Sequence, residues 1–234
     1  MSKEISEIVE LLKTNKLIEA EKKCLKLTEN IKNNLELLNI YAVILFRLKK
    51  YDQAIDQWKK TTILDPKYFF GFNNLGNVYL IKNELDIALK NYNIAIELKS
   101  NYYEAIYNKA NIYLRLKNFT EAIENFDKVL KIKNDYFQAH QGKAIAYKKL
   151  FKFKESIDEW QKVYQYNPRD THALVQKGNL LFDTNRLDEA LKAYTDAFQI
   201  EPEKPFLLGN IIHTKSKMCA WNNYEKDLSN FKKD

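Results

Sequence analysis

Residues 72–79 read Phe72-Asn73-Asn74-Leu75-Gly76-Asn77-Val78-Tyr79, and this stretch decides the fold. Its large or small apolar residues, at 72, 75, 76 and 79, follow the i, i+3, i+4, i+7 spacing of one helical face. Gly76 also belongs to a column, spaced by 34 residues, whose members are mostly small: Ile8, Ala42, Gly76, Ala110, Ala144 and Gly178. A period of this length predicts helical hairpins that bury their apolar faces against neighbouring hairpins.

Two further columns keep the same 34-residue step. One column consists of small residues: Ala20, Ala54, Ala88, Ala122, Ser156 and Ala190. The other consists mostly of aromatic residues: Cys24, Trp58, Tyr92, Phe126, Trp160 and Tyr194. Small side chains let the two antiparallel helices of a hairpin approach closely. The aromatic rings are then expected to fill the space between one hairpin and the next.

The second helix of each hairpin carries start and stop signals. An apolar residue, as at Leu17 or Tyr51, is expected just before this helix. A short polar residue is expected to cap its first N–H groups at Asp52, Asp86, Thr120 and Asp188. Prolines are expected to end the helix, because the residue before a proline is pushed out of the helical region, at Pro66, Pro168 and Pro202.

No insertion or deletion interrupts this period over six units of 34 residues: 1–34, 35–68, 69–102, 103–136, 137–170 and 171–204. The sequence therefore predicts an all-α solenoid of six helix-turn-helix repeats. Glu4 and Glu7 replace apolar residues in the first unit, as expected of a solvated terminal repeat.

The stretch 72–79 resembles the large-x2-Leu-Gly-x2-Tyr pattern of the tetratricopeptide repeat, and the resemblance covers 204 of the 234 residues. It implies a right-handed solenoid whose first helices line a concave surface. It also implies that a peptide or an extended segment of another protein binds in that surface, which makes the chain a protein-binding scaffold.

The family's geometry directs a row of polar side chains of the first helices into the concave groove. The candidate peptide-binding residues are Asn73, Asn74, Asn77, Asn108, Asn111, Gln176 and Asn179, with the cations Arg47, Arg115 and Lys149. Side-chain amides both donate and accept hydrogen bonds, which suits an extended peptide backbone, and the cations would attract an acidic partner. The alternative is that the amides reflect compositional drift on a solvated face.

Residues 205–234 are predicted to form a capping helix, with the start of a truncated second domain as a further hypothesis for this segment. Pro205 is expected to start the helix, and its apolar face is expected to dock on the sixth unit through Phe206, Leu207, Leu208, Ile211 and Ile212.

Residues 206–228 resemble the junction between repeats and catalytic region in O-GlcNAc transferase (SPINDLY-like) glycosyltransferases. The matching residues are His213, Lys215, Cys219, Trp221 and Tyr224. The resemblance implies that the scaffold is the substrate-recognition part of such a protein, whose nucleotide-sugar-binding lobes would lie beyond Asp234. One alternative is the N-terminal portion of an active transferase, and another is a self-associating structural array, so a homo-oligomer stays open.

The remaining chemistry is sparse. The net charge is +7, but lysines are interleaved with acidic residues, which argues against nucleic acid as a partner. The longest apolar run, Ile40–Phe46, is too short to span a membrane, so we expect no membrane partner, and the two cysteines suit a cytoplasmic location. The three histidines are scattered, His140 is expected to be packed or on the surface, and Cys219 is expected to be buried. We therefore expect no enzyme activity in this chain, no metal and no cofactor.

Overall fold

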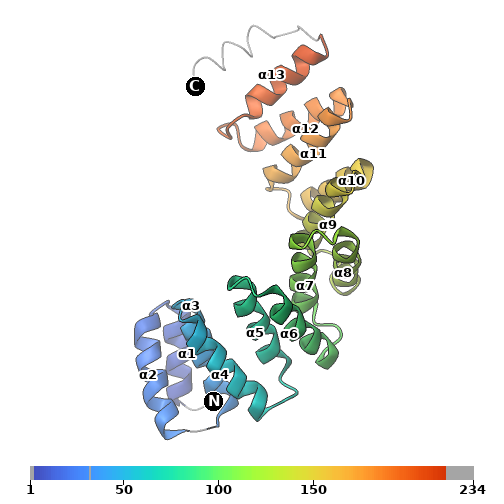
Figure 1. Ribbon diagram of the computed structural model, residues 1–234. Coiled ribbons are helices and arrows are strands. Elements are labelled where there is room, and N and C mark those ends of the chain that lie inside the picture. The colour runs from blue at the N-terminus through green and yellow to red at the C-terminus, as the bar shows by residue number, and fades with distance from the viewer. Residues whose placement is uncertain (1–2, 32, 220–234) are drawn as a thin grey trace. The chain divides into compact units, whose positions relative to one another are not determined.

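The structure, a computed structural model, describes residues 3–31 and 33–219, and every regular element in these ranges is an α-helix (Figure 1). The first helices of the hairpins are α1 (Lys3–Lys13), α3 (Leu35–Arg47), α5 (Phe69–Ile81), α7 (Tyr103–Arg115), α9 (Phe137–Lys149) and α11 (Thr171–Asp183). The second helices are α2 (Leu17–Asn30), α4 (Tyr51–Leu64), α6 (Leu85–Leu98), α8 (Phe119–Ile132), α10 (Phe153–Tyr166) and α12 (Leu187–Ile200), and α13 (Leu207–Lys217) follows. No helix in the described ranges is both long and apolar enough to cross a membrane.

The helix bounds confirm the predicted fold of helical hairpins. Numbering each 34-residue unit from its first residue, α3, α5, α7, α9 and α11 all begin at position 1, and every second helix begins at position 17. The helices form two compact units with their boundary between Ile112 and Tyr113, called here the N-terminal and the C-terminal unit.

Both units pack small residues against rings, as the columns predict. A Cβ atom at Gly76 would lie 2.6 Å from the ring of Tyr92, and one at Gly178 would lie 2.6 Å from the ring of Tyr194. Real Cβ atoms do not approach a ring so closely, so the glycines let first and second helices touch. Ser156, the polar member of the small column, is buried and donates a hydrogen bond to the carbonyl oxygen of Ala144 at 2.7 Å.

The prediction of side-chain caps on the second helices is wrong. Leu17 and Tyr51 are the first helical residues, so Asp52 lies inside the first turn rather than before it. No side chain caps the N-terminus of any described second helix. An acidic residue in the first turn still opposes the positive end of the helix dipole, which explains its place there.

A left-handed backbone residue sets this boundary instead. Position 15 has φ between 58° and 63° in all six hairpins: Asn15, Lys49, Asn83, Lys117, Phe151 and Asn185. In the second hairpin the N–H of Lys49 donates to the carbonyl oxygen of Phe46 and the N–H of Lys50 to that of Leu45, both at 2.9 Å. This pair of bonds is the Schellman motif, which ends the first helix and leaves the next residue to begin the second.

The proline prediction is confirmed. The residue before each proline leaves the helical conformation and forms the C-cap: Asp65, Asn167 and Glu201. Because α6 and α8 end at the same repeat position without a proline, proline reinforces this boundary and is not needed to create it.

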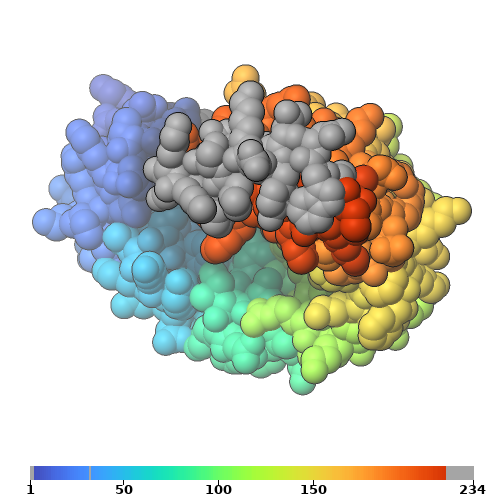
Figure 2. All heavy atoms as spheres, turned by 90° about the horizontal axis from the view of Figure 1, so that it is seen from above, coloured from blue at the N-terminus to red at the C-terminus, as the bar shows by residue number. Residues whose placement is uncertain are grey.

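The hairpin geometry continues beyond Lys204. Helix α13 packs on α12, and its atoms lie against the orange surface of the sixth hairpin in the space-filling view (Figure 2). Cys219, 34 residues after Asn185, again has a positive φ of 54°, and its N–H donates to the carbonyl oxygen of Ser216 at 3.0 Å. Helix α13 and the turn after it therefore repeat the geometry of the first helices of the hairpins.

Three expectations about this segment are corrected. The helix begins at Leu207 and not at Pro205. Leu207 and Ile211 dock on the sixth hairpin, whereas Phe206 has a φ of 68° and is 84% exposed, so it does not join the apolar face. Cys219 is exposed rather than buried. Trp221 and Tyr224, which carry part of the transferase resemblance, lie outside the described residues.

Candidate peptide-binding groove

In the N-terminal unit, four of the predicted amides meet on α5 and α7. The Asn77 Oδ1 accepts two hydrogen bonds, from the hydroxyl of Tyr92 at 2.7 Å and from Nδ2 of Asn108 at 3.0 Å. Burial raises the pKa of Tyr92, so its hydroxyl keeps its proton and donates. The side chain of Asn77 thus connects α5 with both α6 and α7.

These contacts fix how Asn77 faces a ligand. Its carbonyl oxygen is occupied, while its Nδ2 group donates to no residue in the described chain. A half-buried amide held in this way presents N–H donors, which match the carbonyl oxygens of an extended peptide backbone.

Asn73 differs from Asn77, because its side-chain oxygen is enclosed by the fold. Its side chain is only 5% exposed, and its Oδ1 is buried without a hydrogen-bond partner among the described residues. Its Nδ2 makes a long contact of 3.4 Å with Oδ1 of Asn74. Because a bound peptide cannot reach this buried oxygen as it stands, a role of Asn73 in ligand binding stays a prediction.

The C-terminal unit repeats the arrangement around Asn179. The Tyr194 hydroxyl donates to Oδ1 of Asn179 at 2.8 Å, and burial, with Asp183 nearby, raises the pKa of Tyr194 to about 12. Here the amide borders a cavity of about 300 Å³, whose lining residues are Lys148, Asn179, Phe182, Asp183, Tyr194, Asn210, His213 and Thr214.

Helix α13 completes this cavity, a contribution that the repeat pattern of the sequence did not predict. Asn210 and His213 stand 34 residues after Gln176 and Asn179, so α13 extends the polar row by one more helix. The His213 ring lies 5.1 Å from the Phe182 ring, and the Nζ atom of Lys217 lies 4.3 Å from the centre of the Phe182 ring. The cavity therefore combines an aromatic floor with amide and charged groups.

The remaining predicted residues are less concentrated. Nη1 of Arg47 donates to the carbonyl oxygen of Leu12 at 3.1 Å, so its guanidinium binds the C-terminal end of α1. Arg115 and Lys149 are exposed, and Asn111 and Gln176 are half-buried. Their role in ligand binding stays a prediction.

Once the structure is known, the sequence shows a signal for the tyrosines that donate to Asn77 and Asn179. A tyrosine at position 24 occurs in the two hairpins that have Gly-Asn at positions 8 and 9, which are Gly76-Asn77 with Tyr92 and Gly178-Asn179 with Tyr194. Hairpins with tryptophan at position 24 have Ala followed by Val43 or Ile145 instead. The glycine makes room for the ring, and the asparagine receives its hydroxyl.

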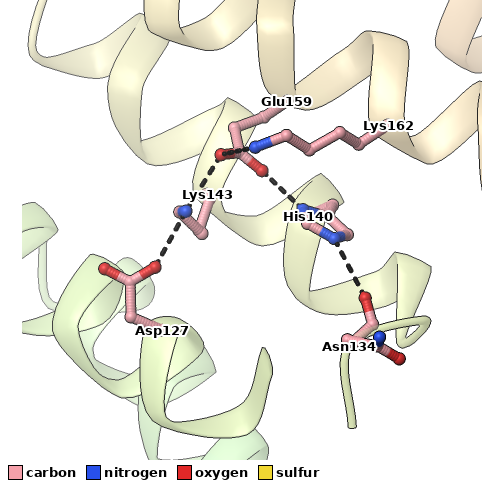
Figure 3. Close-up of polar contacts among 6 residues, drawn as sticks. All are labelled: Asp127, Asn134, His140, Lys143, Glu159 and Lys162. Carbon is pink, nitrogen blue, oxygen red and sulfur yellow. Dashed lines mark hydrogen bonds and ion pairs between the residues drawn. The ribbon is translucent and has the colours of Figure 1, made fainter. Parts of the chain in front are cut away.

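A second polar cluster lies inside the C-terminal unit, where α8, α9 and α10 meet (Figure 3). Glu159 is 4% exposed and accepts from Nδ1 of His140 at 2.6 Å and from Nζ of Lys143 at 2.9 Å. Lys143 also pairs with Asp127 at 2.8 Å, and Lys162 pairs with Glu159 at 3.1 Å. Glu159 is thus an acidic residue inside the fold rather than on a solvated helix face.

This cluster is saturated and therefore structural. Burial alone would raise the pKa of Glu159, but the hydrogen bonds from His140, Lys143 and Lys162 outweigh burial and lower it to about 2. Glu159 is thus ionised at neutral pH with both carboxylate oxygens occupied. No group of three or more His, Cys, Asp or Glu residues that could hold a metal ion occurs in the described ranges.

Family models connect this geometry with known proteins. The tetratricopeptide repeat matches at residues 103–136 and again at residues 142–205. This chain is a tetratricopeptide-repeat protein. No curated protein matches the sequence.

Solved tetratricopeptide-repeat proteins share the fold at low sequence identity. One from Parabacteroides merdae is 20% identical, with a TM-score of 0.70, and the match covers 98% of this chain and 92% of that protein. The C-terminal part of a repeat protein from Cytophaga hutchinsonii is 16% identical, with a TM-score of 0.77 and coverages of 96% and 90%. YrrB, described as having an unusual peptide-binding site, is 17% identical, with a TM-score of 0.65 and coverages of 80% and 96%.

Proposed function

We propose that this tetratricopeptide-repeat protein binds an extended segment of another protein along the polar row of its first helices, and that it acts as a scaffold rather than as an enzyme. The observation that carries the proposal is the pair of tyrosine-anchored asparagines, Asn77 and Asn179. Each uses its carbonyl oxygen inside the fold and leaves its N–H groups for a ligand. The peptide-binding site attributed to YrrB supports the same use of the fold.

A library of random peptides displayed on phage tests this proposal, because it requires no known partner. We expect the wild-type chain to enrich a defined set of peptides and Asn74→Ala with Asn108→Ala to bind them about tenfold more weakly, a loss typical of one or two hydrogen bonds. Asn108→Ala removes one half-buried hydrogen bond to Oδ1 of Asn77 but leaves the bond from the Tyr92 hydroxyl, so the melting temperature should fall only slightly.

Asn91→Ala is the matched control. Asn91 lies on α6, where its Nδ2 donates at 2.8 Å to the carbonyl oxygen of Ile87 in the same helix. This variant should bind the enriched peptides as the wild type does. Equal binding by the double variant would refute the role of the amides.

Two finer roles go with this proposal. A place beside a glycosyltransferase rests on the resemblance of residues 206–228, and a reading frame that continues past Asp234 into nucleotide-sugar-binding lobes would support it. Self-association would appear as a mass above that of the monomer in light scattering. A cytoplasmic location and the absence of nucleic-acid partners likewise remain sequence-based predictions.

A further inference from the structure

The turn between α9 and α10 has an unusual composition. Residues 148–154 read Lys-Lys-Leu-Phe-Lys-Phe-Lys, so every charged side chain in the stretch is a lysine. Lys149, Lys152 and Lys154 are exposed, and Lys148 is half-buried. The turn therefore concentrates positive charge at one point of the C-terminal unit, although the lysines of the whole sequence are dispersed.

These lysines are not neutralised within the fold. None of the four makes an ion pair in the part of the chain that the structure describes. The corresponding turns of the N-terminal unit differ, because Lys50 pairs with Glu21 and Lys82 pairs with Asp52, both at 2.6 Å. The positive charge of the α9–α10 turn is available to a partner.

Phe151 stands at the tip of this turn in an unfavourable conformation. Its φ is 58°, and its side chain is 79% exposed, with one edge-on contact to Phe153 at 6.0 Å. A bulky side chain is disfavoured in the left-handed region, where asparagine is better tolerated, and asparagine occupies the same position in three other hairpins. The fold gains little from the ring, so the ring points to a use outside the fold.

We propose that the α9–α10 turn docks on a lipid bilayer surface that carries anionic headgroups. The Phe151 ring would enter the interface between headgroups and acyl chains, and the flanking lysines would contact the headgroups. Such a surface contact needs no membrane-spanning helix. The expectation of no membrane partner rested on the lack of an apolar run long enough to span a membrane.

The shape of the turn favours a bilayer over a macromolecular partner. A stable protein interface covers about 800 Å² on each side, whereas a tip of seven residues offers a single projecting ring. Proteins that bind single-stranded nucleic acid line a groove with successive aromatic faces, and here only Phe151 is both aromatic and exposed.

Co-sedimentation of the full chain with vesicles tests the proposal. We expect the chain to bind vesicles of phosphatidylcholine mixed with phosphatidylserine, to bind pure phosphatidylcholine much more weakly, and to dissociate as salt is raised. Phe151→Asn should weaken binding about tenfold or more, because the apolar contact is lost. Lys149→Gln and Lys152→Gln should each weaken it about fivefold.

Phe206→Asn is the matched control, since Phe206 is also exposed, also has a positive φ and lies in the same unit, but residues 203–209 contain only one lysine, Lys204. This variant should bind the anionic vesicles as the wild type does. Because asparagine suits the turn, Phe151→Asn should melt at or above the wild-type temperature, so unfolding would not explain its loss of binding. Equal binding by Phe151→Asn, equal capture by neutral vesicles, or binding only to a single-stranded oligonucleotide would each overturn the proposal.

Discussion

The second and fifth hairpins, residues 35–68 and 137–170, share one plan and differ in how they use it. Both place alanine at position 8 and tryptophan at position 24, and both end the second helix before a proline. In the second hairpin the cation Lys50 is paired, and Nε1 of Trp58 donates to Oδ1 of Asn39 at 3.1 Å. In the fifth hairpin the turn lysines are unpaired, and Nε1 of Trp160 has no partner in the described chain.

The difference shows that the hairpin frame tolerates buried polar residues when a buried partner pairs with them, and unpaired lysines where the turn is exposed. Compared with the second hairpin, the fifth has His140 in place of Leu38 and Lys143 in place of Tyr41, and the buried carboxylate of Glu159 binds both. Four predictions separate the contributions of these features.

Glu159→Gln should have the largest effect, because it leaves His140 and Lys143 buried with one carboxylate fewer. We expect a loss of about 3–5 kcal/mol in the free energy of unfolding, measured by urea denaturation. Gln57 occupies the same position in the second hairpin, and Gln57→Ala should change the free energy by less than about 0.5 kcal/mol. Similar losses for the two variants would show that the buried network does not contribute more to the free energy of unfolding than a partly exposed side chain does.

Acid should weaken the wild type through the same carboxylate. The pKa of Glu159 is about 2 in the fold and near 4.5 when unfolded, so its contribution is complete above pH 4.5 and disappears as the pH falls toward 2. This contribution is on the order of 3 kcal/mol. Urea titrations at a series of pH values should show it in the wild type. If Glu159→Gln lost stability just as steeply over this range, another group would be responsible.

The two tryptophans should respond differently to phenylalanine. Trp58→Phe and Trp160→Phe remove the same volume, but only the first removes a hydrogen bond and leaves Oδ1 of Asn39 unpaired. Trp160→Phe removes a buried N–H that has no partner. We expect Trp58→Phe to be more destabilising by about 1–2 kcal/mol in thermal or urea unfolding. The reverse order would mean that the indole of Trp160 is satisfied in solution.

The turn position should give the smallest change, and in the stabilising direction. Phe151→Asn relieves a bulky left-handed residue and should raise the free energy of unfolding by up to about 1 kcal/mol. Lys49→Asn at the same position of the second hairpin should raise it less. Calorimetry of both variants would measure the difference, and a destabilised Phe151→Asn would reveal a packing role for the ring.

The 34-residue period predicted where helices begin because small and aromatic columns must meet at fixed places in every hairpin. The prediction of side-chain caps on the second helices failed, because a left-handed residue and two backbone hydrogen bonds set the boundary between the first and second helices. Asn15, Asn83 and Asn185 at that position were the available signal.

For the candidate site, the sequence indicated which helical face carries the amides but not how they are held. The contact between Asn77 and Tyr92 joins two helices, and one column alone does not reveal it. Glu159 was missed because its own column is polar in most hairpins. The signal lay in His140, a polar residue at a position where the neighbouring hairpins have the apolar residues Ile106 and Leu174.

The left-handed turn has a practical consequence for labelling the protein. Cys219 occupies the seventh such tip and is exposed, while Cys24, the other cysteine of the chain, is fully buried and burial raises the pKa of its thiol to about 12. Only thiolates react with maleimide dyes, so a fluorophore added at neutral pH should attach to Cys219 alone. The natural sequence thus offers a single-site optical reporter beside α13 without any substitution.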